Sequence, residues 1–403
     1  MLAIDVLLRD RRATLEPWFE AQWRAVPAPF YASVDLRNAG VKLAPIDTNL
    51  FPAGFNNLSP RFHPIAVDAV KAEIAKICPT ARGVILVPEN HTRNMYYFEH
   101  LAALVEILSA AGLKVRIGSL LPDLIEPRRI ELASGRGVTL EPLVRVGNRV
   151  RVGDLDPCLV LLNNDLSGGR PAILEGIEQP LAPPLALGWS NRLKSDHFAH
   201  YQQVAAELAA FLDIDPWLID PIFRNCGQVD FEKRAGEECL SLNVEAVLQE
   251  VAGKYKEYGI QREPFVIIKA DAGTYGMAIM TAKSADDVRE LNRKQRTKMS
   301  HAKEGQAVTQ VLVQEGVYTT ETMGNPPATA EPVIYMVGQR VVGGFYRAHP
   351  ERGLTENLNA PGMRLEPMAT TGPDAVPADR FYAYGVVARL ALLAAAREIR
   401  EAS

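Results

Sequence analysis

Hydrophobic and polar residues follow two different patterns in the first quarter of the chain. Residues 31–37 (YASVDLR) and 41–46 (VKLAPI) alternate or run apolar on either side of the turn sequence NAG at 38–40. Asn and Gly accept the positive φ of a tight turn, so this segment predicts a β-hairpin. Residues 83–88 (GVILVP) are apolar without a break, which is typical of a strand buried on both faces.

Strands and helices then alternate as far as residue 200. The predicted helices are 64–77 and 95–111, and the predicted strands are 83–88, 113–118, 157–162 and 183–188. Strands that alternate with helices are typical of βαβ units. We therefore expect an α/β domain with a mainly parallel sheet over residues 61–200.

The second half of the chain shows strands that follow one another as hairpins. The expected helices are 200–214, 244–258 and 379–401, and the expected strands are 265–269, 277–281, 308–314, 332–338 and 340–347. This mixture predicts an α+β domain over residues 201–403. The most apolar stretch, 381–396, is interrupted by Arg389 and is too short to span a bilayer, so we expect a buried helix there.

Composition narrows the class of protein. At 403 residues the chain is long enough for two or three domains. Lys and Arg total 44 against 48 Asp and Glu, so the chain has no overall positive field for nucleic acid. The four cysteines show no C-x-x-C spacing, and the start of the chain makes a poor signal peptide. These features predict a cytoplasmic protein without a disulfide framework or a zinc site.

The stretch FVIIKADAGTYGMAIM at 265–280 is the first with candidate chemistry. A predicted strand ends at Lys269, and a loop with Gly273 and Gly276 leads into another strand. Glycine lets backbone N–H groups approach phosphate oxygens, and lysine adds a positive charge. The loop is not a Walker A sequence. The alternative to phosphate binding is an ordinary hairpin turn with a solvated lysine.

The residues downstream of this loop strengthen the phosphate interpretation. A strand ends in QEGV at 314–317, a hairpin strand ends at Arg347, and ENLNAPG follows at 356–362. This order resembles the ATP-grasp carboxylate–amine ligases, bacterial glutathione synthetase in particular. The resemblance implies phosphate contacts at Lys269, Gly273 and Gly276, adenine contacts at Gln314, Glu315 and Val317, and acyl-phosphate stabilisation by Arg347 and Asn357.

One part of the ATP-grasp pattern is missing after the last helix, where that family has two strands with magnesium ligands. The N-terminal hairpin offers a substitute, with Asp35 on one strand and Asp47 and Asn49 on the next. Residues at i and i+2 on a strand share a face, so these oxygens are within reach of one Mg²⁺. We therefore predict a circular permutation in which residues 1–60 complete the C-terminal lobe. A plain hairpin with surface acids is the alternative, and further ligand candidates are Glu331, Glu356 and Asn359.

Longer strings resemble a narrower family. The strings are SVDLRNAGVKLAPIDTNLFPAGFNNL, IIKADAGTYGM and GFYRAHPERGLTENLNAPGM, and they are similar to proteobacterial glutamate–cysteine ligases of the Thiobacillus type. The resemblance implies that ATP and Mg²⁺ are used to join the γ-carboxylate of glutamate to the amine of cysteine, the first step of glutathione synthesis. Another ATP-grasp ligase, such as glutathione synthetase, and a nucleotide-binding module without catalysis are the alternatives.

Several polar clusters are candidates for binding the amino-acid substrates, and each is equally compatible with a role in loop capping. They are Asn56 with Asn57, Arg93, and Arg192 with Lys194. Arginine pairs bidentately with carboxylates, which suits an amino acid. The basic run 292–298 is either a solvated helix face or a lid that turns Lys298 toward a triphosphate. We expect small-molecule partners, no nucleic acid and no membrane, and leave a homo-oligomer open.

Overall fold

The computed structural model describes residues 3–402 apart from 92, 274–277, 302–306 and 370–375. The helices described are α1 (Ile4–Asp10), α2 (Arg12–Ala25), α3 (His63–Ile77), α4 (Met95–Ala110), α5 (Lys194–Leu212), α6 (Glu237–Tyr258), α7 (Asp286–Arg289), α8 (Arg293–Ser300) and α9 (Ala378–Ala402). The strands described are β1 (Tyr31–Asn38), β2 (Leu43–Asn49), β3 (Gly83–Pro88), β4 (Lys114–Ser119), β5 (Arg128–Glu131), β6 (Gly137–Pro142), β7 (Val144–Val146), β8 (Arg149–Arg151), β9 (Val160–Asn163), β10 (Leu181–Ala182), β11 (Phe223–Gly227), β12 (Val266–Ala270), β13 (Ile279–Ala282), β14 (Gln310–Glu315), β15 (Thr322–Met323), β16 (Ala328–Val337), β17 (Arg340–His349) and β18 (Arg364–Pro367).

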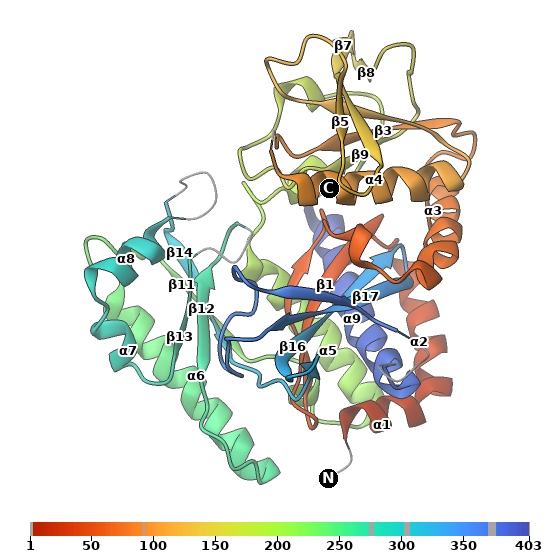
Figure 1. The fold of residues 1–403 in the computed structure, drawn as a ribbon. Helices are drawn as coiled ribbons and strands as arrows, with labels where there is room; N and C mark the ends of the chain where they lie inside the picture. Colours follow the sequence, from red (N-terminus) through yellow and green to blue (C-terminus); the bar gives the residue numbers. More distant parts are fainter. Residues whose placement is uncertain (1–2, 92, 274–277, 302–306, 370–375, 403) are drawn as a thin grey trace.

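The parallel sheet predicted from the alternating strands and helices is present at the top of Figure 1. Its strand order is β10-β9-β3-β4-β6-β5, and β5 alone runs antiparallel to its neighbour. The strand predicted at 183–188 is wrong, because β10 covers only Leu181–Ala182 and a 3₁₀ helix occupies Leu185–Leu187. Pro183 and Pro184 have no N–H group to donate to a neighbouring strand, which ends the ladder there.

The central sheet joins the two ends of the chain. Its strand order is β18-β17-β16-β1-β2, with β15 paired to β16, and these pairings are antiparallel. The predicted N-terminal hairpin is therefore confirmed, and Asp35 of β1 lies opposite Val333 of β16. One face of the sheet packs against α9 and the other against α3. The circular permutation and the domain limits at residues 60 and 200 remain predictions.

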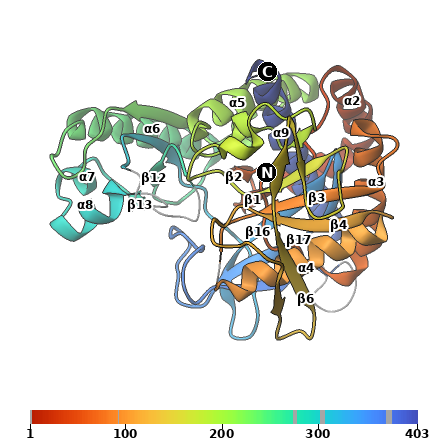
Figure 2. The ribbon, with the colours of Figure 1, turned by 90° about the horizontal axis from the view of Figure 1, so that it is seen from above.

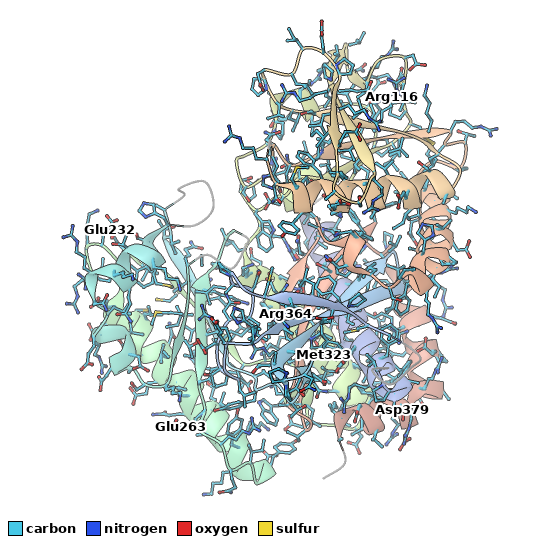
Figure 3. The ribbon with its side chains drawn as sticks, in the orientation of Figure 1. Arg116, Glu232, Glu263, Met323, Arg364 and Asp379 are labelled. Atoms are coloured by element: carbon cyan, nitrogen blue, oxygen red, sulfur yellow. A yellow bond between two sulfur atoms is a disulfide. The ribbon has the colours of Figure 1, made fainter. Side chains whose placement is uncertain are left out.

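The four-stranded sheet forms a separate lobe with the order β11-β14-β12-β13, antiparallel throughout. Helix α6 covers one of its faces. Figure 2 shows α6, α7 and α8 standing to one side of the rest of the molecule. Figure 3 shows the same arrangement with side chains, where Glu263 marks this lobe and Arg116 marks the parallel sheet.

The C-terminal helix α9 has the buried position that its composition predicts. Residues 383–396 are almost all inaccessible to solvent, because α5 and the central sheet pack against this helix. Within the described ranges, none of the helices combines the length and apolar composition that crossing a membrane requires.

The scattered cysteines predicted no disulfide framework, yet the structure contains one disulfide. Cys78, directly after α3, and Cys158, just before β9, form a disulfide. The two residues are 80 positions apart in the sequence, so no local motif predicts the bond. The fold brings the end of α3 beside the start of β9, and only this proximity reveals the pairing. Cys226 and Cys239 are free thiols.

Candidate active site

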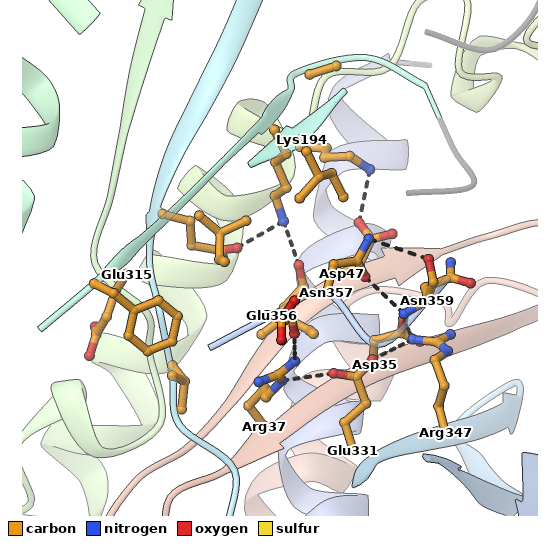
Figure 4. Close-up of a pocket in the computed structure, with 18 of the residues that line it drawn as sticks. Asp35, Arg37, Asp47, Lys194, Glu315, Glu331, Arg347, Glu356, Asn357 and Asn359 are labelled. Atoms are coloured by element: carbon orange, nitrogen blue, oxygen red, sulfur yellow. Dashed lines mark hydrogen bonds and ion pairs between the residues drawn. The ribbon is translucent and has the colours of Figure 1, made fainter. Parts of the chain in front are cut away.

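A cavity opens between the central sheet and the four-stranded sheet. It contains about 880 Å³ of space, counting the part open to solvent, which is ordinary for a small-molecule site. The predicted residues that line it are Asp35, Asp47, Lys194, Lys269, Gly273, Gln314, Glu315, Val317, Glu331, Arg347, Glu356, Asn357 and Asn359. Those labelled in Figure 4 come from both sheets, from the start of α5 and from the loop after β17. The fold therefore gathers segments that lie far apart in the sequence.

Lys269 provides a buried cation on the four-stranded sheet. Its Nζ donates to the carbonyl of Ile46 at 2.5 Å and to Oε1 of Gln314 at 2.8 Å. Burial lowers the pKa of Lys269 to about 8, although Asp47 acts in the opposite direction. Nε2 of Gln314 is buried without a partner among the described residues. The wall therefore presents one cation and one unused N–H donor group to the cavity.

The carboxylate of Glu315 turns away from these groups, as Figure 4 shows. Its Oε2 lies 2.9 Å from Nζ of Lys42, and its Oε1 accepts from Nε1 of Trp217 at 3.1 Å. The pair with Lys42 is almost completely buried. Because the carboxylate is fully engaged, the predicted contact between Glu315 and adenine is restricted to the main chain.

Arg347 lies between two carboxylates on the central sheet. Its Nη1 is 2.7 Å from Oδ2 of Asp35 and 2.7 Å from Oε1 of Glu331. Burial favours the neutral form of Arg347, but the two carboxylates outweigh burial and raise its pKa. Burial also raises the pKa of Asp35, although Arg347 opposes this shift. Nε of Arg347 is buried and has no partner among the described residues, so one donor of this guanidinium is unsatisfied.

Arg37 fixes the loop that carries Asn357. Its Nε donates to Glu331, and its Nη1 and Nη2 donate to the carbonyls of Leu354 and Glu356, each at 2.8 Å. The carbonyl between them belongs to Thr355 and accepts from the hydroxyl of Thr281 at 2.9 Å. Three consecutive carbonyls are thus held by side chains from two different sheets. These bonds place the next residue, Asn357, in the cavity.

Asp47 lies between two lysine side chains. It pairs with Nζ of Lys194 at 2.9 Å and is the cross-strand neighbour of Asp35. Burial would raise the pKa of Asp47, but Lys194 and Lys269 together hold it well below its usual range. Nζ of Lys194 also lies 3.9 Å from the centre of the Trp189 ring. Asp47 is therefore ionised, with a cation on either side.

The donor set limits the kind of metal that this site can hold. In the described part of the chain, no three His, Cys, Asp or Glu side chains are grouped as metal ligands. The carboxylates of Asp35 and Glu331 nevertheless converge on one nitrogen of Arg347, with Asp47 beside Asp35. Mg²⁺ takes one or two protein carboxylates and completes its shell with water and phosphate oxygens. These residues fit a magnesium ion that is shared with a nucleotide.

Arg192 lies outside the cavity and is buried. Its Nε and Nη2 pair with both carboxylate oxygens of Glu398 at 2.6 and 3.0 Å, and its Nη1 donates to the carbonyl of Thr48 at 2.9 Å. These bonds attach the last turns of α9 to β2. The geometry favours a structural role over the predicted contact with a substrate carboxylate.

Five other predicted residues do not line the cavity either, namely Asn49, Asn56, Asn57, Arg93 and Lys298. Oδ1 of Asn49 accepts from the amide of Phe51 at 2.9 Å. Asn56 and Asn57 lie in a short 3₁₀ helix beside α4. Arg93, just before α4, and Lys298, on α8, are exposed. Gly276 falls outside the described residues, so these assignments remain predictions.

Two residues at the site were not predicted from the sequence. Arg37 follows Asp35 by two positions on a strand, so the alternation of side chains was a usable signal. The carboxylate of Asp271 accepts from the amide of Ser195 at 2.7 Å and from its hydroxyl at 2.6 Å, which ties the glycine loop to the start of α5. Its partner lies 76 residues away, and no local pattern indicates this contact.

Comparisons with known proteins identify the family of the whole chain. The glutamate–cysteine ligase family matches residues 5–399. A crystal structure of a protein from Methylobacillus flagellatus KT, assigned as a gamma-glutamylcysteine synthetase, shares 54% identity, with 99% of this chain and 96% of that chain covered and a TM-score of 0.91. No curated protein gives a significant match.

Two more distant structures have TM-scores that are too low to support any argument. One is a glutathione synthetase-like effector from Globodera pallida, with 10% identity, 87% and 77% of the two chains covered, and a TM-score of 0.38. The other is D-alanyl-alanine synthetase A from Vibrio cholerae, with 12% identity, 63% and 67% covered, and a TM-score of 0.28. The family match alone confirms the predicted enzyme class, a ligase that joins glutamate to cysteine. The chain belongs to the glutamate–cysteine ligase family.

Proposed function

We propose that the cavity joins the γ-carboxylate of glutamate to the amine of cysteine while ATP is converted to ADP and phosphate. One observation supports this more than any other. A buried lysine, an unused carboxamide donor, a guanidinium, one buried carboxylate and one partly buried carboxylate line the same space. Cations suit a triphosphate, and the carboxylates suit the magnesium that accompanies it.

The four-stranded sheet is the proposed ATP wall. Lys269 and Gly273 would contact phosphate oxygens. Lys194, which lines the same cavity and pairs with Asp47, would contact these phosphates as well. Gln314 and the main chain of Glu315 and Val317 would contact adenine. Apolar side chains of Phe265, Ile267 and Ile279 complete this wall, which suits a flat base.

The central sheet is the proposed wall for chemistry. A carboxylate does not react with an amine, so the γ-carboxylate first takes the terminal phosphoryl group of ATP. Magnesium, held by one or two of Asp35, Asp47 and Glu331, would neutralise charge on that group. The amine of cysteine then attacks the acyl carbon, the bond to phosphate oxygen breaks, and phosphate leaves. Arg347 would hold the oxygen that becomes negative during this attack, with Asn357 beside it.

The proposal includes an ATP-grasp architecture in circularly permuted form, with the parallel sheet as a preceding domain. Support comes from the N-terminal hairpin, which brings Asp35 and Asp47 beside Arg347 in the central sheet. Because Asn49 bonds to its own turn, Asp35, Asp47 and Glu331 are the stronger metal candidates. A cytoplasmic enzyme acting on small molecules is the setting that this chemistry suits.

Phosphate release by the purified protein tests the proposal. We expect release to require ATP, Mg²⁺, glutamate and cysteine together, with γ-glutamylcysteine as the product by mass spectrometry. Release that needs γ-glutamylcysteine and glycine would instead identify a glutathione synthetase. ATP binding without phosphate release under either pair would identify a nucleotide-binding module and contradict the proposal.

A further inference from the structure

Two thiols lie close together on the side of the four-stranded sheet that faces away from the cavity. The Sγ atoms of Cys226, on β11, and Cys239, on α6, are 3.2 Å apart. Cys226 is buried and Cys239 is exposed, and both are free. The loop that connects β11 to α6 contains Glu232, which is labelled in Figure 3. Neither thiol belongs to the proposed active site.

The geometry around the two sulfur atoms suits bond formation. A disulfide bond is about 2.05 Å long, so the atoms need to approach by only ~1.2 Å, which side-chain rotation can supply. Nδ2 of Asn243, one helical turn after Cys239, lies 3.7 Å from its Sγ and 3.4 Å from the carbonyl of Asn225. Asn243 therefore holds the exposed sulfur against β11 and offers an N–H group to a negative charge on it.

We propose that Cys226 and Cys239 form a modification site that undergoes thiol–disulfide exchange with small disulfides. The thiolate of Cys239 attacks one sulfur of the small disulfide, which gives a mixed disulfide and releases one small thiol. The thiol of Cys226 loses its proton to solvent, and the resulting thiolate attacks Sγ of Cys239 and releases the second small thiol. The two protein sulfurs lose two electrons, and the small disulfide gains them.

Burial fixes the order of these two steps. Cys226 is 1% exposed, so an oxidant in solution reaches Cys239 first. Burial also raises the pKa of Cys226 to about 12, with Cys239 adding to the effect. A thiol with such a pKa is mostly protonated at neutral pH, so it reacts slowly with molecules in solution. Because it lies beside Cys239, it can still attack a disulfide formed on that residue. Cys239 is therefore the attacking thiol and Cys226 the resolving thiol.

The site is independent of the disulfide between Cys78 and Cys158, which lies beside the parallel sheet. It is also independent of the proposed ligase activity, since no substrate takes part. The existing disulfide provides an internal control, because peptide mapping separates the two pairs.

Incubation of the full-length protein with glutathione disulfide, followed by alkylation and peptide mapping, tests the proposal. The wild type should lose two alkylatable thiols and yield a peptide linked through Cys226 and Cys239. Cys226→Ser should stop at a stable mixed disulfide on Cys239. Cys239→Ser should leave Cys226 as a free thiol, with modification at least ~10-fold slower than in Cys226→Ser.

Circular dichroism of both variants verifies that they are folded before the comparison is made. An absence of adduct on Cys239 in folded Cys226→Ser would overturn the proposal. So would a wild-type protein that keeps its adduct on Cys239 without forming the link to Cys226, because the second step would then not occur.

Discussion

The cavity and the carboxyl edge of the parallel sheet both gather polar side chains, but the two regions satisfy them differently. At the sheet edge, Oδ1 of Asn163 is 2.9 Å from the hydroxyl of Tyr97 and 2.9 Å from Nε2 of His100, and its Nδ2 donates to the carbonyl of Pro52 at 2.9 Å. In the cavity, Nε2 of Gln314 and Nε of Arg347 are buried without partners in the described structure. Unpaired buried donors are costly to stability, so a ligand is the natural partner for them.

The difference favours the cavity over the sheet edge as the candidate site. Open α/β sheets place ligands at the carboxyl ends of their strands, and on that rule alone the parallel sheet is the better candidate. The polar groups around Asn163 are instead bonded to one another. Burial lowers the pKa of His100 to about 4, so that this residue is neutral. We expect substitutions in the cavity to change activity and substitutions at the sheet edge to change stability.

Arg347→Ala should have the largest effect on activity. Removal of one donor to a negatively charged intermediate lowers kcat by about 10²–10³-fold, whereas the ATP dissociation constant should change little. Steady-state kinetics and calorimetry measure the two quantities. Arg347→Ala also leaves the carboxylates of Asp35 and Glu331 without their partner. Arg347→Lys, which keeps the positive charge, is therefore the control. An ATP dissociation constant that rises as much as kcat falls would assign Arg347 to ATP binding instead.

Lys269→Ala should weaken ATP binding by about 10–150-fold, the range expected for loss of a charge-assisted hydrogen bond. The fold should survive, because a buried cation is costly to desolvate and its removal ends that cost. Calorimetric titration with ATP measures the affinity, and circular dichroism monitors folding. Unchanged affinity in a folded variant would remove Lys269 from the phosphate site.

Asp47→Asn and Asn49→Ala form a matched pair on one strand. Asp47→Asn should raise the Mg²⁺ concentration for half-maximal activity by ~10-fold, because a charged oxygen ligand is lost. Asn49→Ala should leave this concentration near the wild-type value and lower stability by about 0.5–2 kcal/mol, through loss of the bond to Phe51. Normal magnesium dependence of Asp47→Asn would argue against the permuted metal site.

The pH dependence of ATP affinity sharpens the assignment of Lys269. With a pKa of about 8, the free enzyme loses this positive charge as pH rises through 8. Bound phosphate favours the protonated form, so the ATP dissociation constant should rise by roughly tenfold between pH 7 and pH 9. Lys269→Arg, which stays charged, should flatten the profile. A wild-type affinity that is constant over this range would show that Lys269 does not supply the charge.

Asn163→Ala should leave kcat unchanged and lower the free energy of unfolding by about 1–3 kcal/mol, because the groups it bonds stay buried without partners. Chemical denaturation and kinetic assays under the same conditions measure both. A loss of kcat with intact stability would reverse the comparison and place a substrate at the parallel sheet.

Local patterns predicted most elements of the fold. The hairpin at residues 31–49 and the apolar strand at 83–88 are present because turn residues and buried runs act locally. Patterns failed where distant parts of the chain decide the outcome. The disulfide of Cys78 with Cys158 and the engagement of Glu315 by Lys42 depend on contacts across 80 and 273 positions.

The same limit applies to the site. The glycine loop and the QEGV segment were recognisable because short motifs carry backbone chemistry. For Arg192 the sequence left substrate contact and a structural role equally open, because its partner, Glu398, lies 206 positions away. A single sequence does not reveal whether a charged side chain already has a buried counter-ion.

The pairing of β1 with β16 has a consequence for how the protein is made. Asp35 emerges from the ribosome 312 residues before Arg347, which corresponds to roughly 15–60 s of synthesis at typical elongation rates. During this time the hairpin has an open edge that invites pairing with other nascent chains. Yield in cells should therefore respond to chaperone supply, and the two halves of the polypeptide, if expressed separately, would each carry an incomplete sheet.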